Sequence, residues 1–195
     1  MVLAGGVSAH EHVYGHRVPP AVRIRTRQPS DLDACVLALR RVHDTMGYPL
    51  VWPADPQAWL TLGMQVSAFV AEVDGVIRGH VAVTRPKPGE AASAWAAEFG
   101  VAVDGLLCVS LLFVDPQRQG GGAGSRLLDA AEAEITERGA APALEVISLN
   151  TRAIALYEAR GWRRIGSVSY SWLPEPERSC LYVGPAADSV RSASS

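Results

Sequence analysis

The chain of 195 residues is long enough for one compact domain with a full hydrophobic core and too short for two ordinary ones. Its composition, with 48% hydrophobic and 19% charged residues and a formal net charge of -2, lacks the basic excess typical of nucleic-acid-binding proteins. No run approaches the ~18 apolar residues of a membrane span and no basic segment precedes the first apolar stretch, so we expect a cytoplasmic protein without nucleic-acid or membrane partners.

The cysteines and the two ends of the chain give no sign of a disulfide framework or a metal site. The three cysteines are far apart, odd in number and without a CxxC pair. The histidines within residues 1–20 have no partner cluster, so we expect no bound metal. Residues 1–20 and 185–195 lack sustained periodicity, and we predict disordered tails around a single domain over residues 21–184.

The first predicted elements of that domain are a strand and two helices. Residues 22–26 alternate in the manner of a strand. Ser30 is placed as the N-cap of a helix that continues to about Met46, because apolar residues recur at helical spacing after it. A second, short helix is predicted over residues 57–62, after three prolines.

A hairpin follows. Residues 68–73 and 76–84 are two strand-like runs separated by Asp74-Gly75. This dipeptide favours a type I′ turn, because both turn positions need a positive φ. The sequence therefore predicts two antiparallel strands joined by a tight turn.

The second half of the domain alternates strands and helices. Residues 85–104 form an insertion with a predicted helix at 90–99, and residues 106–114 are continuously apolar apart from Ser110, as in a strand buried on both faces. The remaining predicted elements are a helix from Ala123 that ends before Gly139, a strand at 143–147, a helix at 151–160 that ends before Gly161, and strands at 162–172 and 179–183. This order indicates a mixed α/β fold.

A glycine-rich segment links the buried strand to the helix at Ala123. Gln119 is followed by glycines at 120, 121, 122 and 124. Glycines let the backbone approach a ligand, and a helix N-terminus offers unpaired N–H groups, so this segment is suited to hold a diphosphate. A flexible turn explains the glycines equally well. A Walker A loop and a dinucleotide fingerprint are disfavoured, since the first needs Gly-Lys-Ser/Thr and the second a glycine where Ser125 stands.

Two motifs in this region are similar to those of a known family. Gln119-x-x-Gly122-x-Gly124 resembles the Q/R-x-x-G-x-G/A signature of the GNAT superfamily of acetyl-CoA-dependent N-acetyltransferases. Residues 150–162, NTRAIALYEARGW, resemble the family's N-x-x-A-x-x-L-Y-E-x-x-G-F/W element, and residues 112–116 resemble its central strand and exit. The resemblance implies an α/β (α+β) fold with a mixed, mostly antiparallel sheet flanked by helices, in which acetyl-CoA lies between two splayed central strands.

The resemblance also implies roles for individual residues. Tyr157 is implied as the general acid that protonates the departing CoA thiolate, and the backbone of Leu112 as a donor to the acetyl carbonyl. Gly121 stands where the family often has Lys or Arg, which places some of the phosphate attraction on Arg118, Arg126 or backbone amides. The implied contacts to acetyl-CoA are Leu112, Phe113, Val114, Gln119, Gly120, Gly121, Gly122, Ala123, Gly124, Ser125, Asn150 and Tyr157.

Direct transfer to an amine requires a base, since an aliphatic amine with a pKa of ~10.4 is mostly protonated at neutral pH. Cys108 occupies the position where some family members carry a glutamate, and its apolar strand favours an inert thiol over a nucleophile. His80, His43 and a water held by Ser110 are the candidates for proton removal.

The acceptor is predicted only as the amine of a small molecule or a peptide. Aromatic residues of the first-helix region and of the insertion are candidates to line its pocket, or else to pack in the core or at a homodimer contact: Tyr48, Trp52, Trp59, Trp95 and Phe99. Two other functions share the glycine-rich segment. One is a non-catalytic acyl-CoA-binding module, and the other is a nucleotide-binding regulatory protein, which the missing phosphate-loop lysine disfavours.

Overall fold

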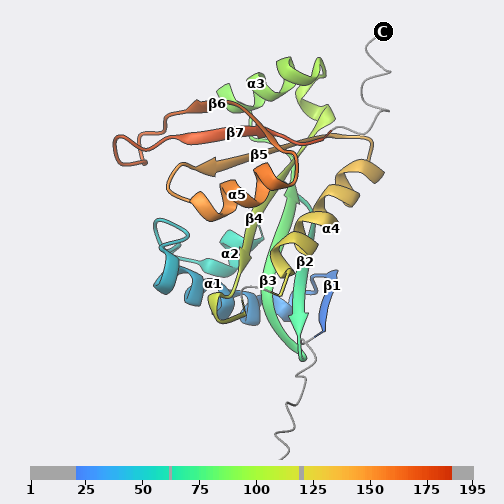
Figure 1. Ribbon diagram of the computed structural model, residues 1–195, viewed down its shortest axis with the longest axis vertical. Coiled ribbons are helices and arrows are strands. Elements are labelled where there is room, and N and C mark those ends of the chain that lie inside the picture. The colour runs from blue at the N-terminus through green and yellow to red at the C-terminus, as the bar shows by residue number, and fades with distance from the viewer. Residues whose placement is uncertain (1–20, 62, 119–120, 186–195) are drawn as a thin grey trace, which may run out of the picture.

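The computed structural model describes residues 21–61, 63–118 and 121–185 (Figure 1). The predicted tails, apart from residue 185, and the loop positions Gln119 and Gly120 lie outside these ranges. Within them, seven strands form one sheet in the order β1-β2-β3-β4-β5-β7-β6. The strands are β1 (Val22–Thr26), β2 (Gln65–Val73), β3 (Val76–Thr84), β4 (Leu106–Val114), β5 (Ala141–Ile147), β6 (Arg163–Val168) and β7 (Ser179–Val183).

Every neighbouring pair in the sheet is antiparallel except β4 and β5, which are parallel. The helices are α1 (Leu32–Met46), α2 (Pro56–Leu60), α3 (Glu90–Phe99), α4 (Ala123–Glu137) and α5 (Thr151–Ala159), with short 3₁₀ turns η1 (Pro29–Asp31), η2 (Val103–Gly105) and η3 (Pro116–Arg118). The predicted fold class, a mixed and mostly antiparallel sheet flanked by helices, is therefore confirmed.

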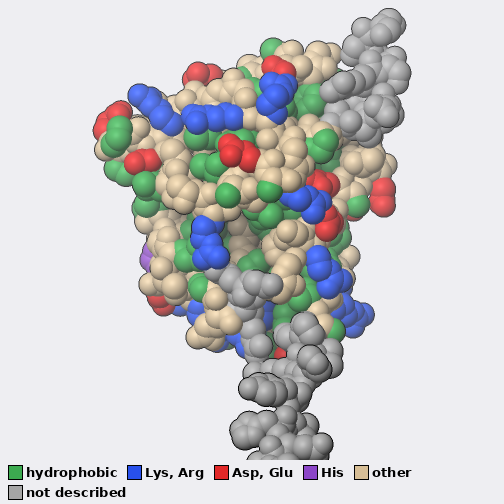
Figure 2. All heavy atoms as spheres, in the orientation of Figure 1, with side chains coloured by type: hydrophobic (Ala, Val, Ile, Leu, Met, Phe, Trp, Pro, Cys, Tyr) green, Lys and Arg blue, Asp and Glu red, His purple; other side chains and the backbone are tan. Residues whose placement is uncertain are grey.

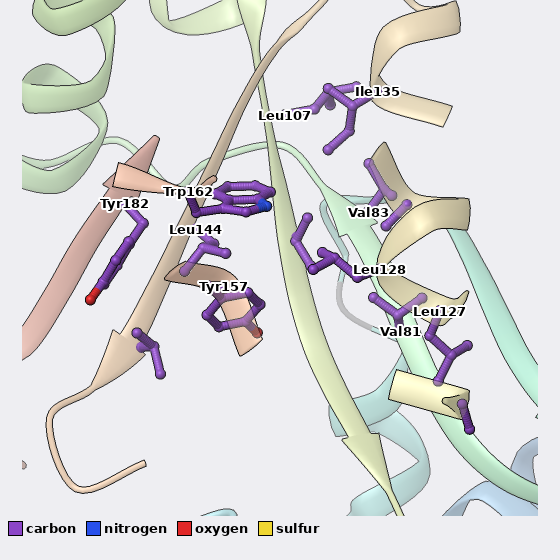
Figure 3. Close-up of a cluster of buried hydrophobic side chains, with 14 of the residues drawn as sticks. Val81, Val83, Leu107, Leu127, Leu128, Ile135, Leu144, Tyr157, Trp162 and Tyr182 are labelled. Atoms are coloured by element: carbon purple, nitrogen blue, oxygen red, sulfur yellow. The ribbon is translucent and has the colours of Figure 1, made fainter. Parts of the chain in front are cut away.

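Helices cover both faces of the sheet. α4 and α5 lie on one face, where their apolar side chains meet those of the central strands in the largest buried cluster (Figure 3). On the other face, α1 and α2 pack over β3 and β4, and α3 packs over β6 and β7. Each helix buries one apolar stripe in this way, and the burial supplies most of its stability. None of the described helices is long and apolar enough to cross a membrane.

Local turn chemistry explains several element boundaries. Asp74 and Gly75 both have positive φ, 52° and 76°, so the predicted hairpin turn between β2 and β3 is confirmed. Gly139 and Gly161 have φ of 66° and 82° just beyond α4 and α5, as expected for residues that end a helix. The helix at residues 90–99 is found as predicted.

The prediction that Ser30 caps the first helix is wrong. A 3₁₀ turn, η1, precedes α1, and the backbone N–H of Gln28 donates to Asp31 Oδ2 at 2.7 Å. Asp31 is held in turn by Arg25 of β1, at 2.7 and 2.9 Å. An ion pair with a neighbouring strand therefore sets this helix start, and hydroxyl capping does not.

The predicted strand over residues 162–172 is also too long. β6 ends at Val168, and the chain then turns through residues 169–178 before β7 begins. The backbone N–H of Leu173 donates to the Tyr170 carbonyl at 3.0 Å, which closes a turn that a strand would not contain. The short helix is likewise Pro56–Leu60 and is capped by Asp55, whose Oδ1 accepts from the N–H of Ala58 at 2.9 Å.

Candidate active site

The two central strands separate halfway along their length. β4 and β5 pair from Leu106↔Ala141 to Val109↔Leu144 and no further. Beyond that point β4 stays paired with β3 on its other side, and β5 stays paired with β7. The sequence prediction of a strand buried on both faces holds for the first half of β4, whereas Ser110 to Leu112 are only partly buried. The separation opens the sheet between the two strands.

A cleft of about 1630 Å³ surrounds this opening. Its walls come from both halves of the sheet and from both faces. On the α4 side it is lined by residues 122–125 and by parts of α5, and on the other side by residues of α3 and of the segment after α1. The opening therefore connects the two faces of the sheet.

A β-bulge shapes the β4 wall. Ser110 pairs with Ala82 and Phe113 with His80, so Leu111 and Leu112 together oppose the single residue Val81. Leu111 has a φ of 52°, which is unusual for a residue with a side chain. The extra residue bends β4 at the place where β5 leaves it.

The start of α4 borders the cleft with backbone alone. Gly122 is the N-cap with a φ of 73° and makes no side-chain capping bond, so the first amides of α4 have no such partner. A Cβ on Gly124 would lie 3.7 Å from Leu156 Cδ2 and 3.8 Å from Val114 Cγ2, in ordinary contact. Unpaired amides at the positive end of a 15-residue helix are suited to bind phosphate oxygens.

Basic side chains near this helix start are few. Arg126 donates to the Val22 carbonyl, and Arg152 of α5 also lines the cleft. On the face shown in Figure 2, Lys and Arg side chains are interspersed with Asp and Glu. Attraction for an anionic ligand here therefore comes from local groups. Sequence reasoning missed Arg152, although its place two residues after Asn150 in the motif was a signal.

Asn150 is the N-cap of α5. Its Oδ1 accepts from the N–H of Ala153 at 3.4 Å, and the residue also lines the cleft. Asn150 therefore caps α5, and its implied contact to acetyl-CoA stays a prediction.

Tyr157 reaches the same cleft from α5, with only 6% of its surface exposed. Its ring packs against Trp162 at 6.0 Å, and in Figure 3 its hydroxyl points toward β4. Burial raises the pKa of Tyr157 well above that of an ordinary phenol, and the neighbouring Tyr48 raises it further. The hydroxyl makes no hydrogen bond to another described residue. It is therefore a neutral donor that is free to face a ligand.

Two glutamates and two phenols face the other side of the cleft, where sequence reasoning placed aromatic residues and a different acidic residue, Asp44 or Glu98. Glu145 is the first residue of β5 beyond the last pair with β4, and its Oε2 accepts from the Tyr170 hydroxyl at 3.2 Å. Glu90 of α3 and Tyr48 line the same space. Sequence reasoning missed Glu145, and the signal was a single charge within the otherwise apolar run Ala141–Ile147.

The predicted aromatic residues separate into two groups. Tyr48 and Trp95 line the cleft. Outside the lining, the Trp59 ring lies 6.2 Å from the Tyr48 ring, and the Arg40 guanidinium lies 4.0 Å over the Trp52 ring. Phe99 packs against the buried cluster that contains Trp95. The cleft is also lined by Tyr170 and Trp172, which stack at 5.5 Å in the turn after β6.

The candidates for proton removal lie in different places. Ser110 lines the cleft, and its Oγ is 2.9 Å from Thr84 Oγ1. His80 is fully buried and does not line the cleft. Its Nδ1 lies 3.1 Å from the Leu111 carbonyl, and its Nε2 lies 3.0 Å from Arg27 Nη1. Burial lowers the pKa of His80 to about 4, and both ring nitrogens are engaged. This geometry gives His80 no route to an acceptor amine.

His43, the remaining predicted base, lies outside the cleft lining, with its Nδ1 2.8 Å from the Pro49 carbonyl. Cys108 lines the cleft, but burial, and then the charge of Glu145, raise the pKa of its thiol to about 12. At neutral pH it is a thiol and not a thiolate. Among the described residues, no cluster of His, Cys, Asp and Glu could hold a metal ion.

Comparison with known proteins supports this assignment of the fold. Residues 39–162 match the model of the acetyltransferase (GNAT) family. The chain is similar in structure to the ribosomal-protein-S18-alanine N-acetyltransferase from Escherichia coli, with a TM-score of 0.63 and 21% identity over 86% of this chain and 95% of the other. A ribosomal-protein-alanine N-acetyltransferase from Brucella melitensis is also similar, with a TM-score of 0.60 and 22% identity over 83% of this chain and 97% of the other.

A third similar structure, from Salmonella typhimurium, contains its cofactor acetyl-CoA and gives a TM-score of 0.59 and 18% identity over 84% and 92% of the two chains. No curated protein matches the sequence significantly. At these identities the structures indicate the shared fold, whereas the family match rests on the sequence and covers more than half of it. With its two motifs flanking an opened sheet, this chain belongs to the GNAT family of acetyltransferases.

Proposed function

We propose that the protein transfers the acetyl group of acetyl-CoA to a primary amine by direct attack. The observation that carries the proposal is the opening between β4 and β5, which is bordered at once by the free helix start at Gly122 and by Tyr157. A module that only binds acyl-CoA would need the helix start, but it would not need a neutral phenol in the same cleft.

The residues at this opening fit an acetyl-CoA molecule. The uncapped start of α4, with no side chain at Gly122 or Gly124, leaves room for a diphosphate against backbone amides. Residues 119–125 would hold that group, and Arg152 of α5 would add a positive charge. Leu112, Phe113, Val114 and Asn150 would contact the rest of the cofactor. When bound, acetyl-CoA supplies an activated thioester, and all other steps fall to side chains and amides of the protein.

Proton movements would run on opposite faces of the sheet. Tyr157, on the α4 and α5 face, would donate its proton to the departing sulfur, since a phenol with a raised pKa stays protonated at neutral pH. Glu145 projects on the face of Cys108 and α3, where it can attract an ammonium group and accept its proton directly or through water near Ser110. The acid and the base therefore do not compete for the same proton.

The acceptor side suits a cationic amine. Two carboxylates, Glu145 and Glu90, lie among aromatic side chains there. Two structural neighbours are named for transfer to an alanine of a ribosomal protein, so a peptide amine is one acceptor class to test beside small amines. We place this activity in the cytoplasm, and a homodimer remains a prediction to be tested by its mass in solution.

Calorimetry with acetyl-CoA and a screen of amines for CoA release test the proposal. Gly124→Glu would add a carboxylate at the helix start without the backbone strain that any side chain meets at Gly122. We expect it to weaken CoA binding by at least about tenfold, through steric and charge repulsion. Gly166→Glu is the matched control, because a Cβ there meets nothing within 4 Å and the residue lies outside the cleft lining. Equal CoA affinity in both variants would refute the assigned phosphate site.

A further inference from the structure

The extra residue in β4 leaves one carbonyl without a strand partner. Leu111 and Leu112 both oppose Val81, so the ladder between β3 and β4 cannot satisfy both peptide groups in the ordinary way. The Leu111 carbonyl instead lies 3.1 Å from Nδ1 of His80, a side chain of the neighbouring strand. Leu111 keeps a φ of 52°, a conformation that is unfavourable for leucine unless its surroundings hold it.

The contacts of His80 fix its tautomer. Arg27 Nη1 lies 3.0 Å from Nε2, and a guanidinium can only donate, so Nε2 must accept. The proton of the neutral ring is therefore on Nδ1, where it is donated to the Leu111 carbonyl. The same contact opposes a second ring proton, since that proton would face the guanidinium.

The ring of His80 is also held against rotation. Arg27 Nη1 donates to the Leu60 carbonyl at 2.7 Å, and its Nη2 donates to Gln65 Oε1 at 3.2 Å. The ring stacks on Phe113 at 5.4 Å with an interplanar angle of 23°. Because His80 is fully buried, no water competes for these bonds.

The direction of one peptide group follows from this arrangement. The bond between Leu111 and Leu112 is trans, so its C=O and N–H point in opposite directions. The carbonyl points to His80, and the Leu112 N–H therefore points away from β3. The alternation of N–H groups along a strand leads to the same direction. The N–H of Asp115 points to β3, because it donates to the Arg78 carbonyl at 2.7 Å. Leu112 lies three residues earlier, so its N–H points to the opposite edge of β4. That edge of β4 has no partner, since β5 stops pairing at Val109.

We propose that His80, anchored by Arg27, is a positioning residue that orients the Leu111–Leu112 peptide so that the Leu112 N–H donates to the thioester carbonyl oxygen. The inference rests on the proposed function and deepens it. His80 does not touch the reacting atoms. It replaces the strand hydrogen bond that the bulge removes, and in this way it holds a backbone donor still while negative charge develops on the oxygen.

Three substitutions of His80 separate this role from simple packing. His80→Asn retains an N–H donor near the position of Nδ1, His80→Gln carries its amide farther along toward Arg27, and His80→Leu removes both polar contacts. Single-turnover rates, CoA affinity and thermal unfolding are measured for each. In addition, the carbonyl stretch of bound acetyl-CoA labelled with ¹³C at the thioester carbon is recorded by difference infrared spectroscopy, because a donated hydrogen bond lowers its frequency.

We expect His80→Leu to bind CoA within about twofold of the parent and to slow the chemical step by ~10 to 10²-fold, less than the ~10² to 10³-fold cost of removing an oxyanion donor outright. The carbonyl frequency should rise in His80→Leu. In His80→Asn, both the frequency and the transfer rate should return toward the parent values. If His80→Leu does not fold, the comparison of His80→Asn with His80→Gln decides the question, with the asparagine variant expected to be faster.

Two results would overturn the inference while leaving the proposed function intact. One is a parent-like rate and carbonyl frequency in a folded His80→Leu or His80→Gln protein, and the other is a set of rates that follows thermal stability instead of the presence of the donor. The parent protein is measured first. If it neither binds acetyl-CoA nor releases CoA with any amine, the proposed function is wrong and this inference is overturned with it.

Discussion

Removing the Tyr157 hydroxyl is the sharpest test of the proposed chemistry. The ring is almost fully buried, but its hydroxyl makes no hydrogen bond to another described residue. Tyr157→Phe should therefore lower the free energy of unfolding by less than about 1 kcal/mol. Loss of a general acid costs ~10² to 10⁴-fold in rate, or about 3 to 5 kcal/mol of barrier at 1.36 kcal/mol per factor of ten. The effect on chemistry should thus exceed the effect on stability several times over.

The assay is rapid-quench transfer from bound acetyl-CoA to a good amine acceptor, with CoA affinity and urea unfolding measured alongside. Tyr182→Phe is the matched control: its hydroxyl donates to Glu158 Oε1 at 2.8 Å, away from the cleft lining, so its loss should reduce stability and spare the rate. Because burial raises the pKa of Tyr157, its proton should remain available above the ordinary phenol range near ~10, and activity should not fall there through its ionisation. A chemical step within about twofold of the parent in Tyr157→Phe would refute the acid role.

Four further outcomes are expected. Glu145→Gln should slow transfer by ~10² to 10⁴-fold at neutral pH with CoA affinity unchanged, as seen in single-turnover rates, and a parent-like rate would exclude it as the base. Cys108→Ala should keep its turnover, whereas an acyl adduct trapped on Cys108 of the parent would establish a covalent route instead. His80 has a pKa lowered from 6.5 to about 4, so between these pH values the unfolded chain binds a proton that the folded protein does not. The free energy of unfolding should therefore fall by about 3 kcal/mol on acidification through this window. Urea unfolding of His80→Asn at the same pH values should lack that part of the loss. Asp115→Ala should lower the free energy of unfolding in urea by about 3 to 5 kcal/mol, because fully buried Asp115 neutralises Arg78 at 2.9 Å and Arg41 at 3.1 Å. A loss below about 1 kcal/mol would show that these charges are solvated.

Much of the fold was predictable wherever a local steric rule decides the backbone. Asp74-Gly75 specifies its turn because few other dipeptides accept two positive φ values, and Gly139 and Gly161 end their helices for a similar reason. The Ser30 cap failed because the competing ion pair joins Asp31 to Arg25 across a loop, and a pattern of neighbours cannot contain such a contact. The same holds for the end of β6, where a turn closed by Leu173 replaces the expected ladder.

The site was only half predictable for a related reason. The helix start at Gly122 and the position of Tyr157 follow from motifs that are contiguous in the chain. The bulge at Leu111 does not, because every residue around it except Ser110 is apolar and the face that each one takes depends on its register with β3. The roles proposed for Glu145 and His80 depend on strand register, because Glu145 lies just past the last pair with β4 and His80 lies opposite Phe113.

The short ladder between β4 and β5 has a consequence for motion. Strands β1 to β4 and strands β5 to β7 form two half-sheets that are joined through only the pairs from Leu106↔Ala141 to Val109↔Leu144. A ladder of this length can act as a hinge, so the width of the opening is set by few hydrogen bonds. A ligand that contacts both walls would bridge the two halves. The free energy of unfolding of the protein would then increase with the ligand concentration. Backbone amides of β4 and β5 near the hinge should then exchange with solvent more slowly when CoA is bound, although none of them belongs to the glycine-rich segment before α4.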